Sequence, residues 1–147
     1  MNAPGRNLSD TLVIVKGGGD LATGIIHRLW RSGFPVIATE AENPTMVRRT
    51  VSFAECLYTG RHEVEGVAAA RAGGKSPEEM LASAKALLGE GVLPVAVDPG
   101  AEIVALAGPA ALVDAIMAKR NLGTRIDQAE VVVGIGPGFT AGVDSHA

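Results

Sequence analysis

The sequence predicts a three-layer, Rossmann-like α/β fold with a mostly parallel sheet. Apolar runs of strand length, such as residues 12–15, recur along the chain without polar alternation, which is typical of strands buried on both faces of a parallel sheet. Between these runs lie glycine-rich turns and stretches with the apolar period of a helix. Strands that alternate with helices favour helices packed on both faces of such a sheet.

The first unit of this fold spans residues 12–40. The apolar run 12–15 stops before three glycines at 17–19, and a helical period starts at Asp20, which suits an N-cap. Ser32 and Gly33 end the predicted helix, and residues 34–39 form a second strand that closes at Glu40. Such a unit is a right-handed βαβ motif. Its helix has an apolar stripe of Leu21, Ala22, Ile25, Ile26, Leu29 and Trp30.

A second helix is predicted to begin at Pro77, with Ser76 as its cap and Glu79 completing a capping box. Gly89 or Gly91 ends it. Further strands are predicted at 92–97, 111–116 and 131–135. Two interpretations stay open for 50–74: short strands at 53–58 and 64–70, or a helix followed by a strand. The buried stripe of the second helix comprises Met80, Leu81, Ala84, Leu87 and Leu88.

Composition limits the class of protein. The 147 residues are 47% hydrophobic and 20% charged, which suits a single folded domain over residues 1–147. The net charge is −3 and aromatic residues make up only 3%, so we expect no nucleic-acid partner. Neither a signal peptide nor a bilayer-spanning run is recognisable, so we expect a cytoplasmic protein that does not bind membranes.

The most informative motif is the glycine loop after the first strand. Residues 17–22 match G-x-G-x-x-G/A, a loop that lets backbone amides approach a phosphate at a helix N-terminus. Glu40 ends the second strand, where an acidic residue bonds a ribose hydroxyl. The motif predicts nucleotide binding, with a purely structural turn as the alternative. Asp20 could repel a pyrophosphate, or hold a metal or a hydroxyl. The candidates are Gly17, Gly18, Gly19, Asp20, Leu21, Ala22 and Glu40.

Three further loops should meet at the same edge, because ligands bind beyond the carboxyl ends of parallel strands. Adjacent arginines at 48 and 49 could clamp a phosphate, and the acidic residue at 98 could line the site or serve only its turn. Glycine-rich residues 134–142 resemble an anion-binding nest, and basic residues at 119, 120 and 125 favour a polyanionic small ligand. The candidates are Arg48, Arg49, Asp98, Lys119, Arg120, Asn121, Gly136, Gly138, Phe139 and Thr140.

Reactive side chains give weaker signals. The single cysteine, Cys56, lies in an apolar stretch and is expected to be a buried small hydrophobe. His27, His62 and His146 have no partners at ligand spacing, so no metal site is predicted. No serine has a placed histidine partner, so a hydrolase triad is not supported and no catalytic residue is assigned.

From about residue 13 to 144, the chain contains the strings VKGGGDLATGIIHRLWRSGFPVIATE, NPTMVRRTVSFAECLYTG, EVEGV, VDAIMAKRNLGTRID and GIGPGFTAGVD. Together these five strings resemble the YqeB family. Members of that family are accessory proteins of the selenium-dependent molybdenum hydroxylase system and are related in role to the XdhC/CoxI maturation proteins. They usually continue beyond the last string, so this chain resembles the N-terminal part of a longer protein.

The resemblance implies a maturation role toward an apo molybdenum hydroxylase, whose molybdenum cofactor the protein would help to load or modify. We expect a non-catalytic accessory protein that binds a nucleotide-bearing cofactor, either a molybdopterin dinucleotide or NAD(P). Two alternatives stay open: an NAD-dependent oxidoreductase, and a sulfur or selenium relay through Cys56. The Ala- and Val-rich composition also favours a homo-oligomer.

Overall fold

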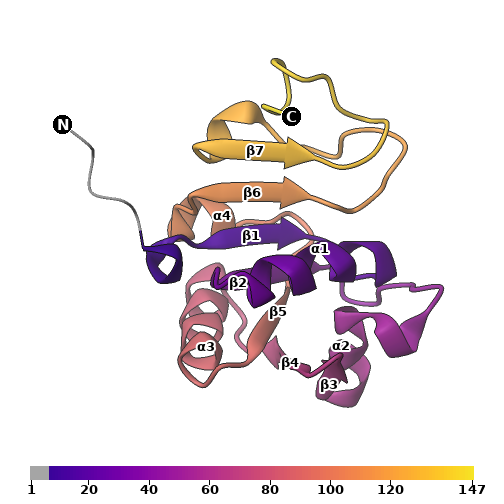
Figure 1. Ribbon diagram of the computed structural model, residues 1–147, viewed down its shortest axis with the longest axis vertical. Coiled ribbons are helices and arrows are strands. Elements are labelled where there is room, and N and C mark those ends of the chain that lie inside the picture. The colour runs from indigo at the N-terminus through magenta and orange to yellow at the C-terminus, as the bar shows by residue number, and fades with distance from the viewer. Residues whose placement is uncertain (1–6) are drawn as a thin grey trace.

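The computed structural model describes residues 7–147, which form a seven-stranded sheet of order β3–β4–β5–β2–β1–β6–β7 (Figure 1). Neighbouring strands are parallel except for the antiparallel pair β3 and β4. The strands are β1 (Val13–Lys16), β2 (Val36–Glu40), β3 (Arg61–Val64), β4 (Val67–Ala72), β5 (Leu93–Val97), β6 (Ala111–Asp114) and β7 (Val131–Gly134). The α-helices are α1 (Asp20–Arg31), α2 (Cys56–Thr59), α3 (Pro77–Gly89) and α4 (Ile103–Ala107).

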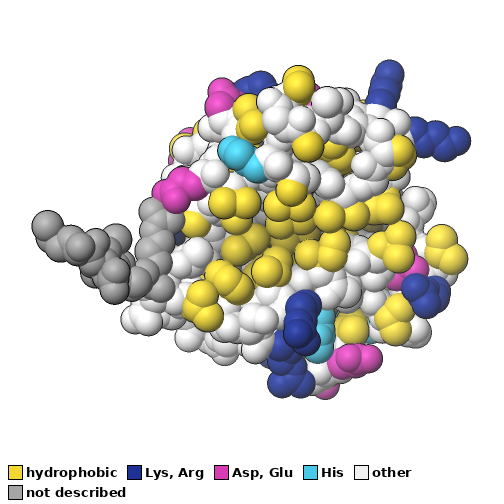
Figure 2. Space-filling view, turned by 45° about the horizontal axis from the view of Figure 1, so that its top comes forward, with side chains coloured by type: hydrophobic (Ala, Val, Ile, Leu, Met, Phe, Trp, Pro, Cys, Tyr) yellow, Lys and Arg dark blue, Asp and Glu magenta, His cyan; other side chains and the backbone are white. Residues whose placement is uncertain are grey.

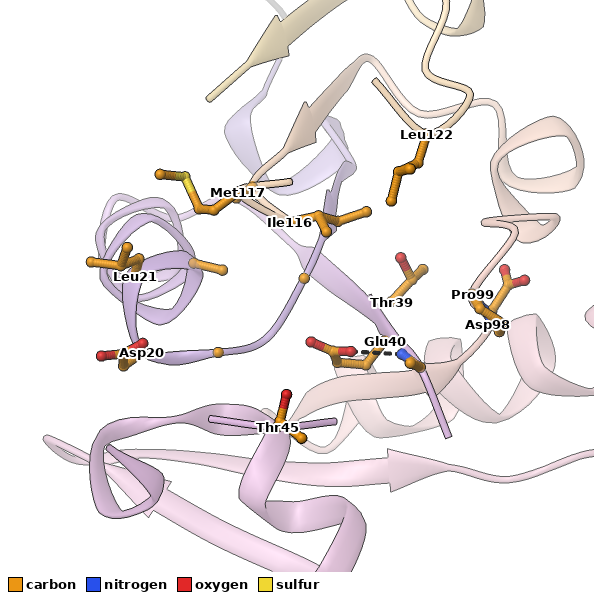
Figure 3. A pocket seen from close by; sticks show the side chains of 15 residues that line it. Asp20, Leu21, Thr39, Glu40, Thr45, Asp98, Pro99, Ile116, Met117 and Leu122 are labelled. Carbon is orange, nitrogen blue, oxygen red and sulfur yellow. Dashed lines mark hydrogen bonds between the residues drawn. The ribbon is translucent and has the colours of Figure 1, made fainter. Parts of the chain in front are cut away.

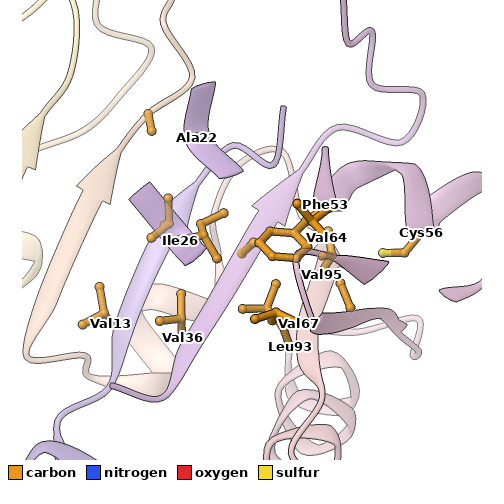
Figure 4. Close-up of a cluster of buried hydrophobic side chains, with 14 of the residues drawn as sticks. Val13, Ala22, Ile26, Val36, Phe53, Cys56, Val64, Val67, Leu93 and Val95 are labelled. Atoms are coloured by element: carbon orange, nitrogen blue, oxygen red, sulfur yellow. The ribbon is translucent and has the colours of Figure 1, made fainter. Parts of the chain in front are cut away.

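Helices pack on both faces of the sheet, which confirms the predicted three-layer α/β fold. On one face α1 packs over a cluster that includes the fully buried Phe53 and Ile26 (Figure 4). On the other face α3 and α4 pack over a second cluster. Along β1, Val13 and Val15 enter the first cluster and Ile14 the second. A strand buried on both faces has to be apolar at successive positions, as the sequence predicts.

The face under α1 is only partly covered. That helix packs on β1 and β2. On β7, at the edge of the sheet, Val133 is partly buried and Val131 is half-exposed. Figure 2 shows apolar side chains gathered across the middle of the molecule in that view. Among residues 7–147, no helix is long and apolar enough to cross a bilayer.

Of the two helix caps predicted from the sequence, that of α3 is confirmed and that of α1 is wrong. The Ser76 hydroxyl accepts a hydrogen bond from the Glu79 amide at 3.2 Å, which confirms the predicted cap of α3. The predicted capping box is not completed, because the Glu79 carboxylate accepts from the Lys75 amide at 2.8 Å rather than from the Ser76 amide. The prediction that Asp20 caps α1 is wrong: Gly19 is the N-cap, and Asp20 is the first helical residue.

The segment with two open interpretations is closer to a helix followed by strands. Two 3-10 turns, η2 (Arg49–Val51) and η3 (Phe53–Glu55), precede α2, and the hairpin of β3 and β4 follows. The antiparallel strand β3 and the short helix α4 were not predicted. Strand β6 ends at Asp114, earlier than predicted, because its carboxylate accepts the Ile116 amide at 3.2 Å and turns the chain.

Candidate functional site

A cavity of about 300 Å³ opens beyond the carboxyl ends of β1, β2, β5 and β6 (Figure 3). Strand β1 pairs with β2 on one side and with β6 on the other, so the order of strands reverses at β1. Open parallel sheets bind ligands at this kind of switch point. The cavity is lined by Gly17, Gly19, Asp20, Leu21, Ala22, Thr39, Glu40, Ala41, Thr45, Asp98, Pro99, Ala115, Ile116, Met117 and Leu122.

The three glycines of the first loop serve different purposes. Gly17 has a φ of +106°, and a Cβ there would lie 3.0 Å from the Ala115 carbonyl oxygen. Gly18 packs against Ala54, whose amide donates to the Gly18 carbonyl at 2.8 Å. Gly19 lines the cavity, and a Cβ there would meet no heavy atom within 4 Å. Gly17 and Gly19 therefore both line the cavity, and only at Gly19 would an added side chain enter open space.

A buried threonine on α1 holds this loop in place. The Thr23 hydroxyl donates to the Gly18 carbonyl at 3.2 Å and accepts from the Phe53 amide at 2.9 Å. It thereby ties the glycine loop to η3 across the end of the helix. Sequence reasoning missed Thr23; the available signal was a hydroxyl residue beside the apolar stripe of the helix.

Glu40 lies at the cavity wall, at the end of β2, as predicted. One carboxylate oxygen accepts the Gly18 amide at 3.1 Å, and the other accepts the Ala41 amide at 2.6 Å. These two contacts fix the orientation of the carboxylate. Because an ionised carboxylate has about four lone-pair sites, Glu40 can accept further hydrogen bonds from a ligand.

The two arginines do not form a joint clamp. Arg48 donates to Asp20 at 2.9 Å, and this hydrogen bond holds the pKa of the Asp20 carboxyl below its usual value. Arg49 makes two hydrogen bonds to Glu55, at 2.7 and 3.0 Å, and its guanidinium lies 4.8 Å from the centre of the Tyr58 ring. Hydrogen bonding to Arg49 likewise lowers the pKa of Glu55. The first residue of α1, Asp20, therefore already places a carboxylate at the helix N-terminus, and this carboxylate is paired with Arg48.

Asp98 lines the cavity but also has a structural task. Its two carboxylate oxygens accept the amides of Glu102 and Ile103, at 2.9 and 3.0 Å, and so cap the start of α4. The side chain is buried. Both interpretations of Asp98 made from the sequence therefore describe part of its environment.

The structure does not bring Lys119, Arg120 or Asn121 onto the cavity lining, although Leu122 from the same loop lies there. The Asn121 amide oxygen instead accepts the Thr124 amide at 2.7 Å, which folds the loop on itself. Among the described residues, those that line the cavity also include no lysine or arginine. The cavity is therefore acidic, whereas the sequence indicated a locally basic edge.

The glycine-rich stretch after β7 also packs against its own chain. A Cβ at Gly138 would lie 2.5 Å from the Arg120 carbonyl carbon. The Phe139 ring packs on Gly134, and the Thr140 amide donates to the Asp144 carboxylate at 3.0 Å. Gly136, Gly138, Phe139 and Thr140 are absent from the cavity lining.

Directly before the lining residues Gly17 and Ala115, at the ends of β1 and β6, lies a buried polar cluster that sequence reasoning missed. The Lys16 ammonium donates to the Thr124 hydroxyl at 2.8 Å and lies 3.6 Å from Asp114. The Thr124 hydroxyl donates in turn to Asp114 at 2.6 Å. This cluster joins the ends of β1 and β6. The signal in the sequence was a lysine that closes an otherwise apolar strand directly before the glycine loop.

The remaining reactive residues lie away from the cavity lining. Cys56 is fully buried, as predicted, and burial raises the pKa of its thiol to about 12 (Figure 4). His27, His62 and His146 each hydrogen-bond a backbone group. Within residues 7–147, no group of three or more His, Cys, Asp or Glu side chains could hold a metal ion.

The whole chain matches a protein of Escherichia coli (strain K12) named "Uncharacterized protein YqeB". The two are 45% identical over 147 residues. The chain is thus similar to one part of YqeB. It spans 26% of the length of YqeB, and the match supports the family that the five strings indicate. Neither a protein-family model nor a solved structure matches the chain.

Proposed function

We propose that the protein is a non-catalytic accessory factor for a selenium-dependent molybdenum hydroxylase. It binds a nucleotide-bearing cofactor, a molybdopterin dinucleotide or NAD(P), at the carboxyl end of its sheet. The observation that carries the binding part is the cavity at the switch point, with Gly19 open to it and Glu40 fixed at its wall. The resemblance to the YqeB family supplies the hydroxylase system.

The contacts at the cavity support a role in holding a ligand. The Glu40 carboxylate can accept hydrogen bonds from ribose hydroxyls, and bonds to an ionised acceptor are stronger than neutral ones. Gly19 lets a ligand approach the backbone at the start of α1. The described lining contains no His, Cys, Tyr or Lys, so its polar groups are suited to binding and orientation.

The binding part is tested by thermal unfolding and calorimetric titration of the chain with NAD, NADP, ATP, CTP and a molybdopterin dinucleotide. A ligand at 100 times its Kd stabilises the folded state by about 2.7 kcal/mol. The molybdopterin dinucleotide should stabilise the protein most. The absence of any shift with all five ligands would refute nucleotide binding.

Two site variants and a matched control place the ligand. Glu40→Gln should weaken binding about tenfold or more, because a hydrogen bond to a charged group contributes about 1.5–3 kcal/mol. Glu42→Gln removes the same charge from an exposed side chain two residues further on, outside the lining, and should leave Kd unchanged. Gly19→Asp should abolish binding while the chain still folds, because a side chain there enters open space.

The maturation part is tested with a purified selenium-dependent hydroxylase. The protein loaded with molybdopterin dinucleotide should restore activity to the apo-hydroxylase, and the Gly19→Asp variant should not. Equal activation by the free dinucleotide would contradict the role of the protein in delivery.

A further inference from the structure

The cavity has an apolar side that the proposed function does not use. Leu21 on α1 and Ile116, Met117 and Leu122 after β6 all line it. These four residues are 57%, 39%, 41% and 55% exposed, respectively, although large apolar residues are more often buried. In Figure 3 the three residues that follow β6 lie along one side of the cavity, opposite Thr45. The result is an exposed apolar surface built from two separate segments of the chain.

Met117 also has a strained backbone. Its φ is +63°, in the left-handed region that favours glycine. Of the three non-glycine residues with positive φ in the described chain, Glu65, Ala101 and Met117, only Met117 lines this cavity. Strained residues of this kind cluster at ligand clamps, where the side chain is needed despite its backbone.

The polar side of the cavity carries acidic groups. Asp20, Glu40 and Asp98 contribute carboxylates, and the described lining includes no lysine or arginine. A polyphosphate inside the cavity would therefore meet the like charge of Glu40 and Asp98, whereas an uncharged ring and its sugar hydroxyls would not. The charge of Asp20 is offset by Arg48, 2.9 Å away. The volume of about 300 Å³ is at the lower end of the range for ligand pockets, and it suits one nucleoside-sized group.

We propose that the cavity binds a planar heteroaromatic ring against Leu21, Met117 and Leu122, with any sugar hydroxyls toward Glu40 and any phosphates in solvent. The ring is the base of a nucleoside or a pterin, which share a flat shape and apolar faces. This assignment rests on the proposed function, because it states which part of the nucleotide-bearing cofactor the site recognises.

The ligand arm of the test titrates the whole chain with adenosine, cytidine, neopterin, ribose 5-phosphate and pyrophosphate. At least one ring compound should bind within about tenfold of the best dinucleotide or nucleoside triphosphate. Ribose 5-phosphate and pyrophosphate should bind at least about a hundredfold more weakly. The preferred ring compound distinguishes a nucleobase from a pterin. Tighter binding of pyrophosphate than of every ring compound would overturn the assignment and leave nucleotide binding intact.

The variant arm uses the strain at Met117. Met117→Gly removes the apolar side chain and relieves the positive φ, so the melting temperature should stay the same or rise while ring affinity falls about tenfold. Glu65→Gly relieves a similar backbone in the turn between β3 and β4, outside this cavity, and should not change affinity. Unchanged ring affinity in Met117→Gly would overturn the assignment. Failure of every ring compound and every nucleotide to bind would overturn both proposals.

Discussion

Removal of one partner of the buried ion pair between Lys16 and Asp114 should destabilise the protein strongly, and the losses from the two single substitutions should not add. The ammonium lies 3.6 Å from the carboxylate, and the two side chains are 6% and 3% exposed. At this separation an effective dielectric constant of about 20 gives an attraction of about 5 kcal/mol. Removal of one partner leaves the other charge buried alone, which typically costs about 3–5 kcal/mol. We expect Asp114→Ala to lower the free energy of unfolding by about that amount.

The second variant completes a thermodynamic cycle. Lys16→Met keeps the aliphatic stem and removes the charge, and Asp114 then retains the Thr124 hydroxyl at 2.6 Å and the Ile116 amide at 3.2 Å. Its loss of stability should be smaller than that of Asp114→Ala. In the double variant neither charge is left unpaired, so the loss should fall below the sum of the single losses by about 2 kcal/mol or more.

Urea unfolding followed by the fluorescence of Trp30, the single tryptophan, measures these losses. Arg125→Ala is the matched control, because its ion pair with Asp127 is 3.1 Å long but the side chains are 67% and 70% exposed. Its effect should stay within about 1 kcal/mol. Additive losses, or a loss in Asp114→Ala no larger than in the control, would refute the reasoning. If Asp114→Ala does not fold, the double variant should still recover folding, and its failure to do so would refute the reasoning.

Three further predictions concern other parts of the chain. Burial raises the pKa of the Cys56 thiol from its ordinary value near 9 to about 12, so stability should be fully present below pH 9 and fall as the pH rises toward 12. Urea unfolding at pH 8 and pH 10 checks this, and Cys56→Ala should remove that part of the pH dependence. Ser76→Ala should lower the free energy of unfolding by about 1 kcal/mol through loss of the α3 cap, measured in urea, and an unchanged value would contradict the cap. Gly134→Ala should lower the melting temperature, because its methyl group would overlap the Phe139 ring, and a second substitution, Phe139→Ala, should recover part of the loss.

Much of the fold could be predicted from the sequence because its signals are local. The apolar run of β1, the change of period at Asp20 and the cap at Ser76 each involve neighbours within a few residues. A strand that is buried on both faces of a sheet requires a continuous apolar run, so these runs also predict the parallel sheet. The position of Glu40 at the cavity could also be predicted, because Glu40 ends a parallel strand and ligands bind beyond the carboxyl ends of such strands.

The sequence by itself therefore determined the α/β class, most of the strands and the glycine turn with Glu40 beside it. Only the tertiary structure decided which side chains share the cavity. Strand β6 pairs with β1, and this pairing brings Ile116, Met117 and Leu122 to the glycine loop from a distant part of the chain. The arginines at 48 and 49 lie near carboxylates that satisfy them, and the buried lysine finds its partner on another strand. Such contacts depend on strand order and loop folding, which one-dimensional spacing does not encode.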